Sequence, residues 1–383
     1  MTFQGLFGYL SALCLTLSIL ALFINSNDQI NFLRNKYGLL ILISLSVTTI
    51  SILITQILRG DFSAAAYDGP IRLLIVLPIL MAIYKHKIDF TKLLSYTIPL
   101  ALLAIFMYAK LNTHSYEHRL TNPYMDPILW GNFSILLGFL SFASIKSDDQ
   151  LAIRVYKLFG FGLGGYMSLL SESRSGWLAF IIITFLWLVL NRKNLAPKQI
   201  LLFGLTFLLG LATIYIFSDS FSNRINTAFL EINSWVDKTQ IGSSTGYRLT
   251  MWKMTLYLFS QSPWVGYGEY SSLPVLNDSY ILSFADPGSI YTIQCCGPHN
   301  EIAAYGLKFG ALGIFSLLAI HFIPTYIFNQ SKDFQSKIMG ISFCVGIFVC
   351  GFTTEMLGLK VTFTFYAIIM SGMLATALWK SKS

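Results

Sequence analysis

Apolar runs long enough to cross a bilayer recur along this 383-residue chain. Residues 39–58, 200–217 and 302–328 approach or exceed the roughly 20 apolar residues that a helix needs to cross a hydrocarbon core of about 30 Å. Because lipid cannot hydrogen-bond to backbone N–H and C=O groups, such runs must be helices. Charged residues make up only 11% of the chain and hydrophobic residues 55%, far from soluble averages. We therefore expect an all-α, polytopic integral membrane protein.

Eleven candidate spans begin near residues 5, 38, 70, 93, 127, 155, 175, 200, 302, 338 and 361. Short loops that carry Lys and Arg stay on the cytoplasmic side of a membrane. Such residues occupy alternate loops, which we place inside: Arg34, Lys36, Lys85, Lys87, Lys92, Lys146, Arg154, Lys157, Arg192, Lys193, Lys198, Lys332, Lys337, Lys380 and Lys382. This pattern predicts a cytoplasmic C-terminus and, with an odd number of spans, an N-terminus outside.

One connection is much longer than the others. We expect a single transmembrane domain, residues 1–383, with a large outer loop, residues 218–301, inserted between spans. Within the loop, GYRLTMWKMTLYLF has apolar residues near helical spacing and predicts an amphipathic helix at the membrane interface. The Pro and Gly residues of SPWVGYGEY predict a turn after it.

The net charge of +8 does not indicate a nucleic-acid partner, because the cytoplasmic cations are dispersed beside the spans. There they set topology and contact anionic membrane lipids. Arginine on the outer face is less expected, and its planar fork suits phosphate better than the ammonium of lysine does. A diphosphate-binding site is therefore predicted from the outer arginines: Arg59, Arg72, Arg119, Arg174, Arg224 and Arg248.

Structural alternatives stand beside this interpretation. Arg174, in SESRSGW between two apolar runs, either extends to interfacial water or marks a substrate path at membrane depth. Arg72, in YDGPIRLLIVLP, either binds ligand or closes a helix end in an ion pair with Asp68, four residues earlier. Arg119, in a Pro-containing loop, can take either role.

His299 ends the outer loop, directly before the apolar run that begins near residue 302. With an ordinary pKa of about 6.5, histidine is the side chain best suited to accept a proton near neutral pH. A histidine at a helix start is often a capping or packing residue, but outer arginines favour a catalytic base. The five cysteines form no disulfide framework by their spacing. Cys295 and Cys296 offer an alternative nucleophile.

Five segments, taken in order, resemble the O-antigen ligase family: YDGPIRLLIVLP, HRLTNPYMDPILWGN, SESRSGWLAF, STGYRLTMWKMTLYLFSQSPWVGYGEY and PHNEIAAYGLKFGALGIF. The resemblance covers roughly residues 60–320. It implies about 11 to 12 transmembrane helices in a GT-C-like glycosyltransferase architecture. It also implies a location in the bacterial inner membrane, with the active site facing the periplasm.

The same resemblance implies a chemistry. Arg174 and Arg248, with Arg72 and Arg119, would bind the diphosphate of an undecaprenyl-linked glycan. His299 would deprotonate a sugar hydroxyl of lipid A core, which displaces undecaprenyl diphosphate with inversion. Supporting roles fall to Asn300, Glu301, Asp68 and Tyr305. We expect no cofactor and no metal, and no Asp-x-Asp motif is present.

Departures and alternatives remain. Many family members have a His where this chain has Gly297, so Glu301 or Tyr305 would have to support His299 here. O-antigen polymerase or pilin oligosaccharyltransferase would use the same donor with another acceptor. A lipid-linked glycan flippase would need charges along the middle of its spans, whereas here they cluster at the outer ends.

Overall fold

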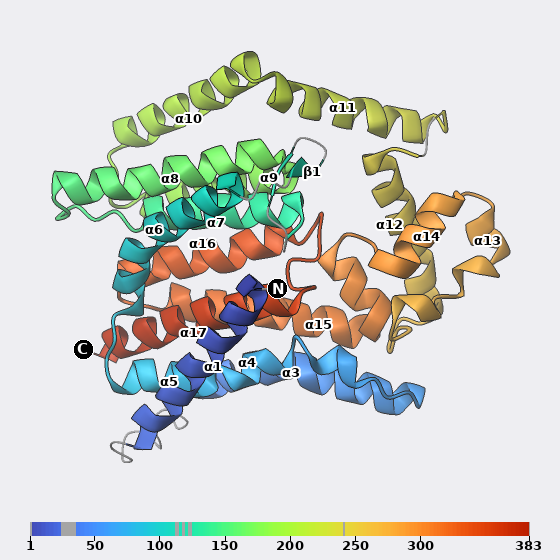
Figure 1. Ribbon diagram of the computed structural model, residues 1–383, viewed down its shortest axis with the longest axis horizontal. Coiled ribbons are helices and arrows are strands. Elements are labelled where there is room, and N and C mark those ends of the chain that lie inside the picture. The colour runs from blue at the N-terminus through green and yellow to red at the C-terminus, as the bar shows by residue number, and fades with distance from the viewer. Residues whose placement is uncertain are drawn as a thin grey trace.

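The computed structural model describes residues 2–23, 36–111, 115–116, 119–121, 125–239 and 242–382. It is an all-α protein, as predicted, and Figure 1 shows its helices packed side by side in a bundle with α12, α13 and α14 gathered at one end. We refer to this as the α12 end. Within the described residues the only strands are a two-residue antiparallel pair, β1 (Ser115–Tyr116) and β2 (Arg119–Leu120).

The bundle and its loops contain the following helices: α1 (Thr2–Phe23), α3 (Lys36–Arg59), α4 (Ile71–Ile75), α5 (Leu77–Lys85), α6 (Phe90–Leu111), α7 (Pro127–Ala143), α8 (Leu151–Ser171), α9 (Arg174–Asn191), α10 (Pro197–Phe217), α11 (Asp219–Val236), α12 (Ser244–Gln261), α13 (Ser279–Leu282), α14 (Pro287–Cys296), α15 (Glu301–Asn329), α16 (Phe334–Cys350) and α17 (Lys360–Lys382). Short 3₁₀ turns occupy Ala64–Tyr67, Tyr270–Ser272 and Pro274–Leu276.

A helix lies at each of the eleven predicted spans, although the span near residue 70 is divided into α4 and α5. Among the described residues, six helices are long and apolar enough to cross a membrane: α3, α6, α9, α10, α15 and α17. The chain is thus a multi-pass membrane protein. Arg34 and parts of the HRLTNPYMDPILWGN segment, residues 118 and 122–124, lie outside the described residues. Which side of a membrane each end faces stays a prediction.

Ion pairs join loops that were predicted to share the cytoplasmic side. Lys380, at the end of α17, lies 2.7 Å from Asp89 before α6 and 3.5 Å from Asp333 before α16. Three connections therefore meet at one end of the bundle, opposite the α12 end. This arrangement agrees with the alternation of basic and non-basic loops in the sequence.

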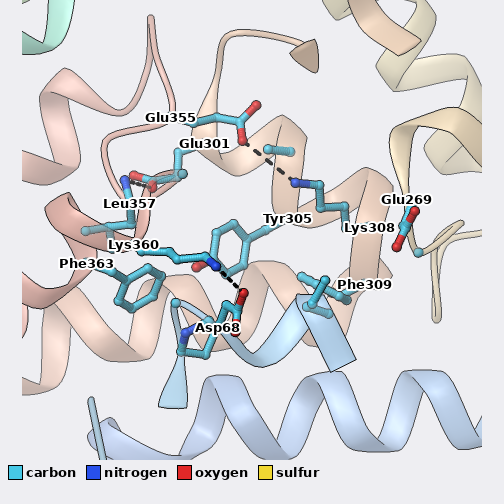
Figure 2. Close-up of a pocket in the computed structure, with 17 residues that line it drawn as sticks. Asp68, Glu269, Glu301, Tyr305, Lys308, Phe309, Glu355, Leu357, Lys360 and Phe363 are labelled. Carbon is cyan, nitrogen blue, oxygen red and sulfur yellow. Dashed lines mark hydrogen bonds and ion pairs between the residues drawn. The ribbon is translucent and has the colours of Figure 1, made fainter. Parts of the chain in front are cut away.

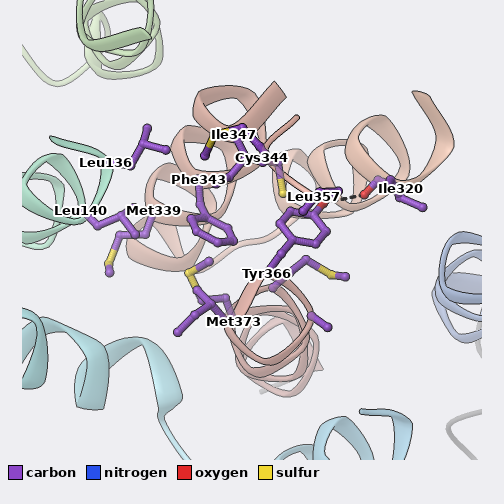
Figure 3. Packing of buried hydrophobic residues seen from close by; sticks show 14 of the residues in the cluster. Leu136, Leu140, Ile320, Met339, Phe343, Cys344, Ile347, Leu357, Tyr366 and Met373 are labelled. Atoms are coloured by element: carbon purple, nitrogen blue, oxygen red, sulfur yellow. Dashed lines mark hydrogen bonds between the residues drawn. The ribbon is translucent and has the colours of Figure 1, made fainter. Parts of the chain in front are cut away.

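The core of the bundle lies between α15, α16 and α17, with α7 packed against it (Figure 3). Phe343 of α16 and Tyr366 of α17 stack with ring centroids 5.7 Å apart. The Tyr366 hydroxyl donates to the Ile320 carbonyl on α15 at 2.7 Å. A buried tyrosine needs such a partner, and here the hydrogen bond fixes α17 against α15.

Helix α15 is interrupted at Gly310, whose φ of 61° and ψ of −152° leave the helical region. Only glycine adopts this conformation readily, and a Cβ atom there would overlap the backbone of Trp264. The segment after α12 hydrogen-bonds to the backbone groups that the break frees: Tyr267 N to Leu307 O (2.7 Å), Gly268 N to Lys308 O (2.9 Å) and Ala311 N to Pro263 O (2.7 Å). The predicted turn therefore anchors the outer loop to a span.

Helix α12 lies where an amphipathic helix was predicted, but its apolar side is covered by protein. Met251, Met254 and Leu258 are buried against Ile293 of α14 and Leu307 of α15. The outer loop consequently has its own small core. Exposed apolar side chains remain in the loop, among them Phe229 and Leu230 of α11 and Leu256 of α12.

Helices α7 and α8 approach closely through glycine. A Cβ atom on Gly164 would lie 2.7 Å from the Gly138 Cα and would overlap the Ser134 carbonyl, whereas one on Gly162 would meet nothing within 4 Å. Small residues allow helix backbones to approach in this way.

We expect Gly164→Ala to lower the thermal unfolding temperature in detergent, at a cost of about 1–3 kcal/mol from overpacking. Gly162→Ala is the matched control, and it should be neutral or slightly stabilising because alanine favours helix. Equal melting temperatures for the two variants would contradict the close packing of α7 on α8.

Candidate active site

Four predicted site residues converge at the α12 end and form what we term the cationic cluster: Arg119 of β2, Arg174 at the start of α9, Arg248 of α12 and His299 before α15. Burial, and then the charges of Arg174 and Arg119, lower the pKa of Arg248 to about 10. Burial and then the charge of Arg248 lower the pKa of His299. Arg248 therefore lies close enough to Arg174, Arg119 and His299 for their charges to interact.

Arg248 carries an unsatisfied donor. Its Nη1 donates to the Ser244 hydroxyl at 3.2 Å, but its Nε is buried and has no hydrogen-bond partner in the described structure. A buried guanidinium donor left unpaired is costly. An anion in the cluster would satisfy the Nε group and the charge together.

Two carboxylates hold the cluster in place. Glu231 of α11 lies 3.7 Å from Arg174 Nη1, and it accepts hydrogen bonds from the Thr245 backbone N–H and hydroxyl at the start of α12. Glu172 accepts from Arg224 Nε at 2.6 Å. These contacts tie α11 and α12 to the α8–α9 turn, so that Arg174 faces Arg248.

Arg119 and Asp126 complete the cluster from the α7 side. Arg119 Nε donates to the Ser171 carbonyl at 2.8 Å, which ties β2 to the end of α8. Asp126 caps α7 by accepting from the backbone N–H of Ile128 (2.8 Å) and Leu129 (3.1 Å). The negative charge of Asp126 raises the pKa of His299, whereas burial lowers it.

His299 stands in a strained turn. Its φ of 50° is unusual for a residue with a side chain, and such backbone strain clusters at functional sites. On either side, the Pro298 carbonyl accepts from Trp252 Nε1 at 3.1 Å, and Asn300 caps α15 while donating to Phe352 O at 3.0 Å. No described group hydrogen-bonds to the His299 ring, which leaves its nitrogen lone pair open to a substrate.

Gly297 is required by its surroundings. Its φ is 81°, and a Cβ atom there would overlap the Tyr270 ring and the Glu355 carboxylate. The Tyr270 hydroxyl donates to Glu355 at 2.7 Å. These side chains fill the space that a histidine at position 297 would need.

Glu301 and Tyr305, predicted to support His299, make no hydrogen bond with its ring in the described structure. Glu301 is buried and instead accepts from the Leu357 N–H at 2.6 Å, while its own N–H donates to Gly351 O at 2.7 Å. Its support is indirect, because it fixes the start of α15 against the loop before α17.

Arg72 and Asp68 are not brought into the cationic cluster by any contact. Arg72 donates to the Asp68 carbonyl oxygen and to the Thr364 hydroxyl, both at 2.9 Å. The Asp68 carboxylate pairs with Lys360 at 2.5 Å, which lowers its pKa. The geometry therefore favours the helix-closing alternative for Arg72, although through Thr364 rather than through an Asp68 ion pair.

Glu231, Asp126 and Trp252 were missed as members of the site. Nothing in the sequence around Glu231 distinguishes it from the other acidic residues of the outer loop. The Asp-Pro pair at 126–127 does signal a helix start, but not a contact with His299. Only packing brings these side chains to the cluster.

The cysteine prediction needs correction. Cys295 and Cys296 are joined to each other in a disulfide at the end of α14, two residues before Pro298. They are thus not free thiols available as nucleophiles. Elsewhere in the described chain, no group of three His, Cys, Asp or Glu residues is arranged to hold a metal ion.

Comparison with known proteins confirms the family resemblance. Residues 159–318 match the family model described as O-Antigen ligase. An uncharacterised protein of Haemophilus influenzae is 26% identical over 278 residues, which cover 70% of this chain and 67% of that protein. An O-antigen ligase of Escherichia coli K12 is 29% identical over 188 residues, 48% of this chain and 43% of that protein. The region that matches the family model, residues 159–318, includes Arg174, Arg248 and His299.

We expect inorganic pyrophosphate to raise the melting temperature of the purified protein, because it satisfies the orphan Arg248 donor and offsets the repulsion among the cations. Arg248→Gln should abolish this stabilisation. Arg192→Gln, which removes an exposed arginine at the other end of α9, is the control and should retain it. Equal stabilisation of all three proteins would show that the cluster is not the anion site.

Proposed function

We propose that this chain, with its O-antigen ligase family domain at residues 159–318, transfers a glycan from undecaprenyl diphosphate to a sugar hydroxyl of lipid A core. The family match and the ligase relative support a lipid-linked glycan transferase in general. One structural observation carries the finer proposal: a buried, unpaired Arg248 donor lies beside an open histidine ring in one cluster. The site would face the periplasm from the bacterial inner membrane.

In this proposal His299 is the general base. Burial and the neighbouring Arg248 lower its pKa, so the imidazole is neutral at neutral pH and can accept a proton. It takes the proton from the acceptor hydroxyl, and the oxygen attacks the anomeric carbon of the donor sugar. The bond from that carbon to the phosphate oxygen breaks, and undecaprenyl diphosphate leaves with the electron pair. A single displacement inverts the configuration.

The arginines stabilise the leaving group. Negative charge grows on the diphosphate oxygen as the bond breaks, and fixed guanidinium groups that strengthen their contacts at that moment lower the barrier. In this proposal Arg248 and Arg174 take this role, and Arg119 adds its charge to the cluster. Glu231 holds Arg174 in position and partly neutralises it before the donor arrives.

His299→Ala should leave the protein folded and inserted but lower glycan transfer about 10²- to 10⁴-fold, the contribution of a general base. Cells that carry only this variant should show bare lipid A core on a gel. His86→Ala, at an exposed histidine that contacts Ala21 O near the opposite end, should give a normal ladder. A normal ladder from the His299 variant would show that His299 is not the general base.

The pH profile tests the environment of His299. Since the neutral imidazole is the active form, kcat/KM should fall as pH drops through the His299 pKa, and the midpoint of this fall should lie below 6.5. Arg248→Gln removes a cation that opposes protonation, so the midpoint should rise. Arg192→Gln is the control, and its midpoint should not change. An unchanged midpoint in Arg248→Gln would show that the charge of Arg248 does not act on His299.

Purified protein offered the lipid-linked glycan with either lipid A core or a second lipid-linked glycan separates ligase from polymerase. We expect transfer to lipid A core alone. Chain growth on the second donor instead would identify the polymerase activity.

A further inference from the structure

A cavity of about 460 Å³ lies beside the His299 turn and is separate from the cationic cluster. It is lined by the start of α15, by residues 65–70, by residues 268–269 of the outer loop and by residues 355–363 before and within α17 (Figure 2). None of Arg119, Arg174, Arg248 and His299 contributes to its wall. Its volume falls within the range of small-molecule sites.

The lining carries acidic and basic side chains together, whereas the ionisable groups of the cluster are basic. Two ammonium groups, of Lys308 and Lys360, are outnumbered by four carboxyl groups: Asp68, Glu269, Glu301 and Glu355. Aromatic rings of Tyr305, Phe309 and Phe363 complete the wall. A ligand rich in hydroxyl groups would find acceptors, donors and apolar faces together here.

Several lining groups are already satisfied. Lys360 pairs with Asp68 at 2.5 Å, and Glu301 accepts from the Leu357 N–H at 2.6 Å. These contacts, drawn in Figure 2, build the wall and do not await a ligand.

Other groups retain hydrogen-bonding capacity toward the cavity. Tyr305 is only 9% exposed, and its hydroxyl, directed into the space between α15 and Asp68 in Figure 2, has no hydrogen-bond partner in the described structure. Lys308 Nζ lies 3.9 Å from Glu355 Oε2, too far for a hydrogen bond. Glu269 uses one oxygen to accept from Ser63 at 2.9 Å. A hydroxyl on the cavity wall that no described group satisfies is available to hydrogen-bond a ligand.

The cavity adjoins the base. Glu301, in its wall, follows His299 by two residues, and the Glu355 carboxylate, also in the wall, packs directly against Gly297. A ligand in the cavity therefore lies against the turn that carries the imidazole.

We propose that this cavity binds an unphosphorylated sugar of the acceptor glycan and presents its hydroxyl to His299. The inference rests on the proposed glycan transfer and assigns the acceptor subsite to Tyr305, Lys308 and Glu269. The different chemistry of the two sites then sorts the substrates, because the diphosphate donor is held by the cationic cluster and the neutral acceptor sugar by the hydroxyl, charged and aromatic side chains of the cavity.

The test uses full-length protein in lipid nanodiscs, with Tyr305→Phe and Glu269→Gln as variants and Asp237→Asn, at an exposed residue of the outer loop, as control. In the first two, the KM for lipid A core should rise about tenfold, as expected for one lost buried hydrogen bond. The donor KM and kcat at saturating acceptor should stay within about twofold. The control should match wild type. Unchanged acceptor KM in both cavity variants of an active enzyme would overturn the assignment.

Binding without turnover separates this inference from the proposed function. His299→Ala protein should bind a soluble lipid A core oligosaccharide in calorimetry, and addition of Tyr305→Phe should weaken that binding about tenfold. The same oligosaccharide phosphorylated on its terminal sugar should bind more weakly. Equal binding by the single and double variants, or tighter binding of the phosphorylated form, would overturn the acceptor subsite. If the wild-type protein binds the oligosaccharide but transfers no glycan to it, the result would instead count against the proposed reaction alone.

Discussion

The arrangement of the site depends on the need to satisfy backbone groups at the break in α15. Where Gly310 leaves helical geometry, carbonyl and N–H groups lose their partners within the helix, and a membrane provides no water to replace them. Segment 263–268 supplies the partners, reinforced by Arg59, which donates to the Lys308 carbonyl at 3.1 Å. Because this segment directly follows α12, its attachment to α15 also sets α12, and hence Arg248, against the turn at His299.

The cationic cluster is stable only because carboxylates and helix ends surround it. Arg248 and Arg174 repel each other, and burial penalises both charges. Glu231, 3.7 Å from Arg174, offsets part of this cost. The unpaired Arg248 Nε shows that compensation is incomplete without an anion. A guanidinium with a free donor can form a new hydrogen bond as negative charge grows on a departing diphosphate. A contact that is stronger in the transition state than in the ground state accelerates the chemical step.

His299 lies between two different environments. On one side are guanidinium groups; on the other, the cavity with Glu355 and Glu301. Burial raises the pKa of Glu355, although Lys308 opposes this. The turn itself is held from both sides, by Trp252 through Pro298 and by the close packing of Gly297. Holding a base rigidly between two substrates lowers the entropic cost of bringing them together.

Hydropathy and charge patterns alone determined the all-α class, the positions of the eleven helices, the long helical connection and the candidates Arg174, Arg248 and His299. These properties are readable because the bilayer imposes a length and a periodicity on every segment separately. Tertiary structure decided which candidates meet. It joined Glu231 to Arg174, left Arg72 with Thr364 and covered the apolar side of α12 with protein. Such contacts arise between segments far apart in the chain, and they depend on how helices pack, which no local pattern records.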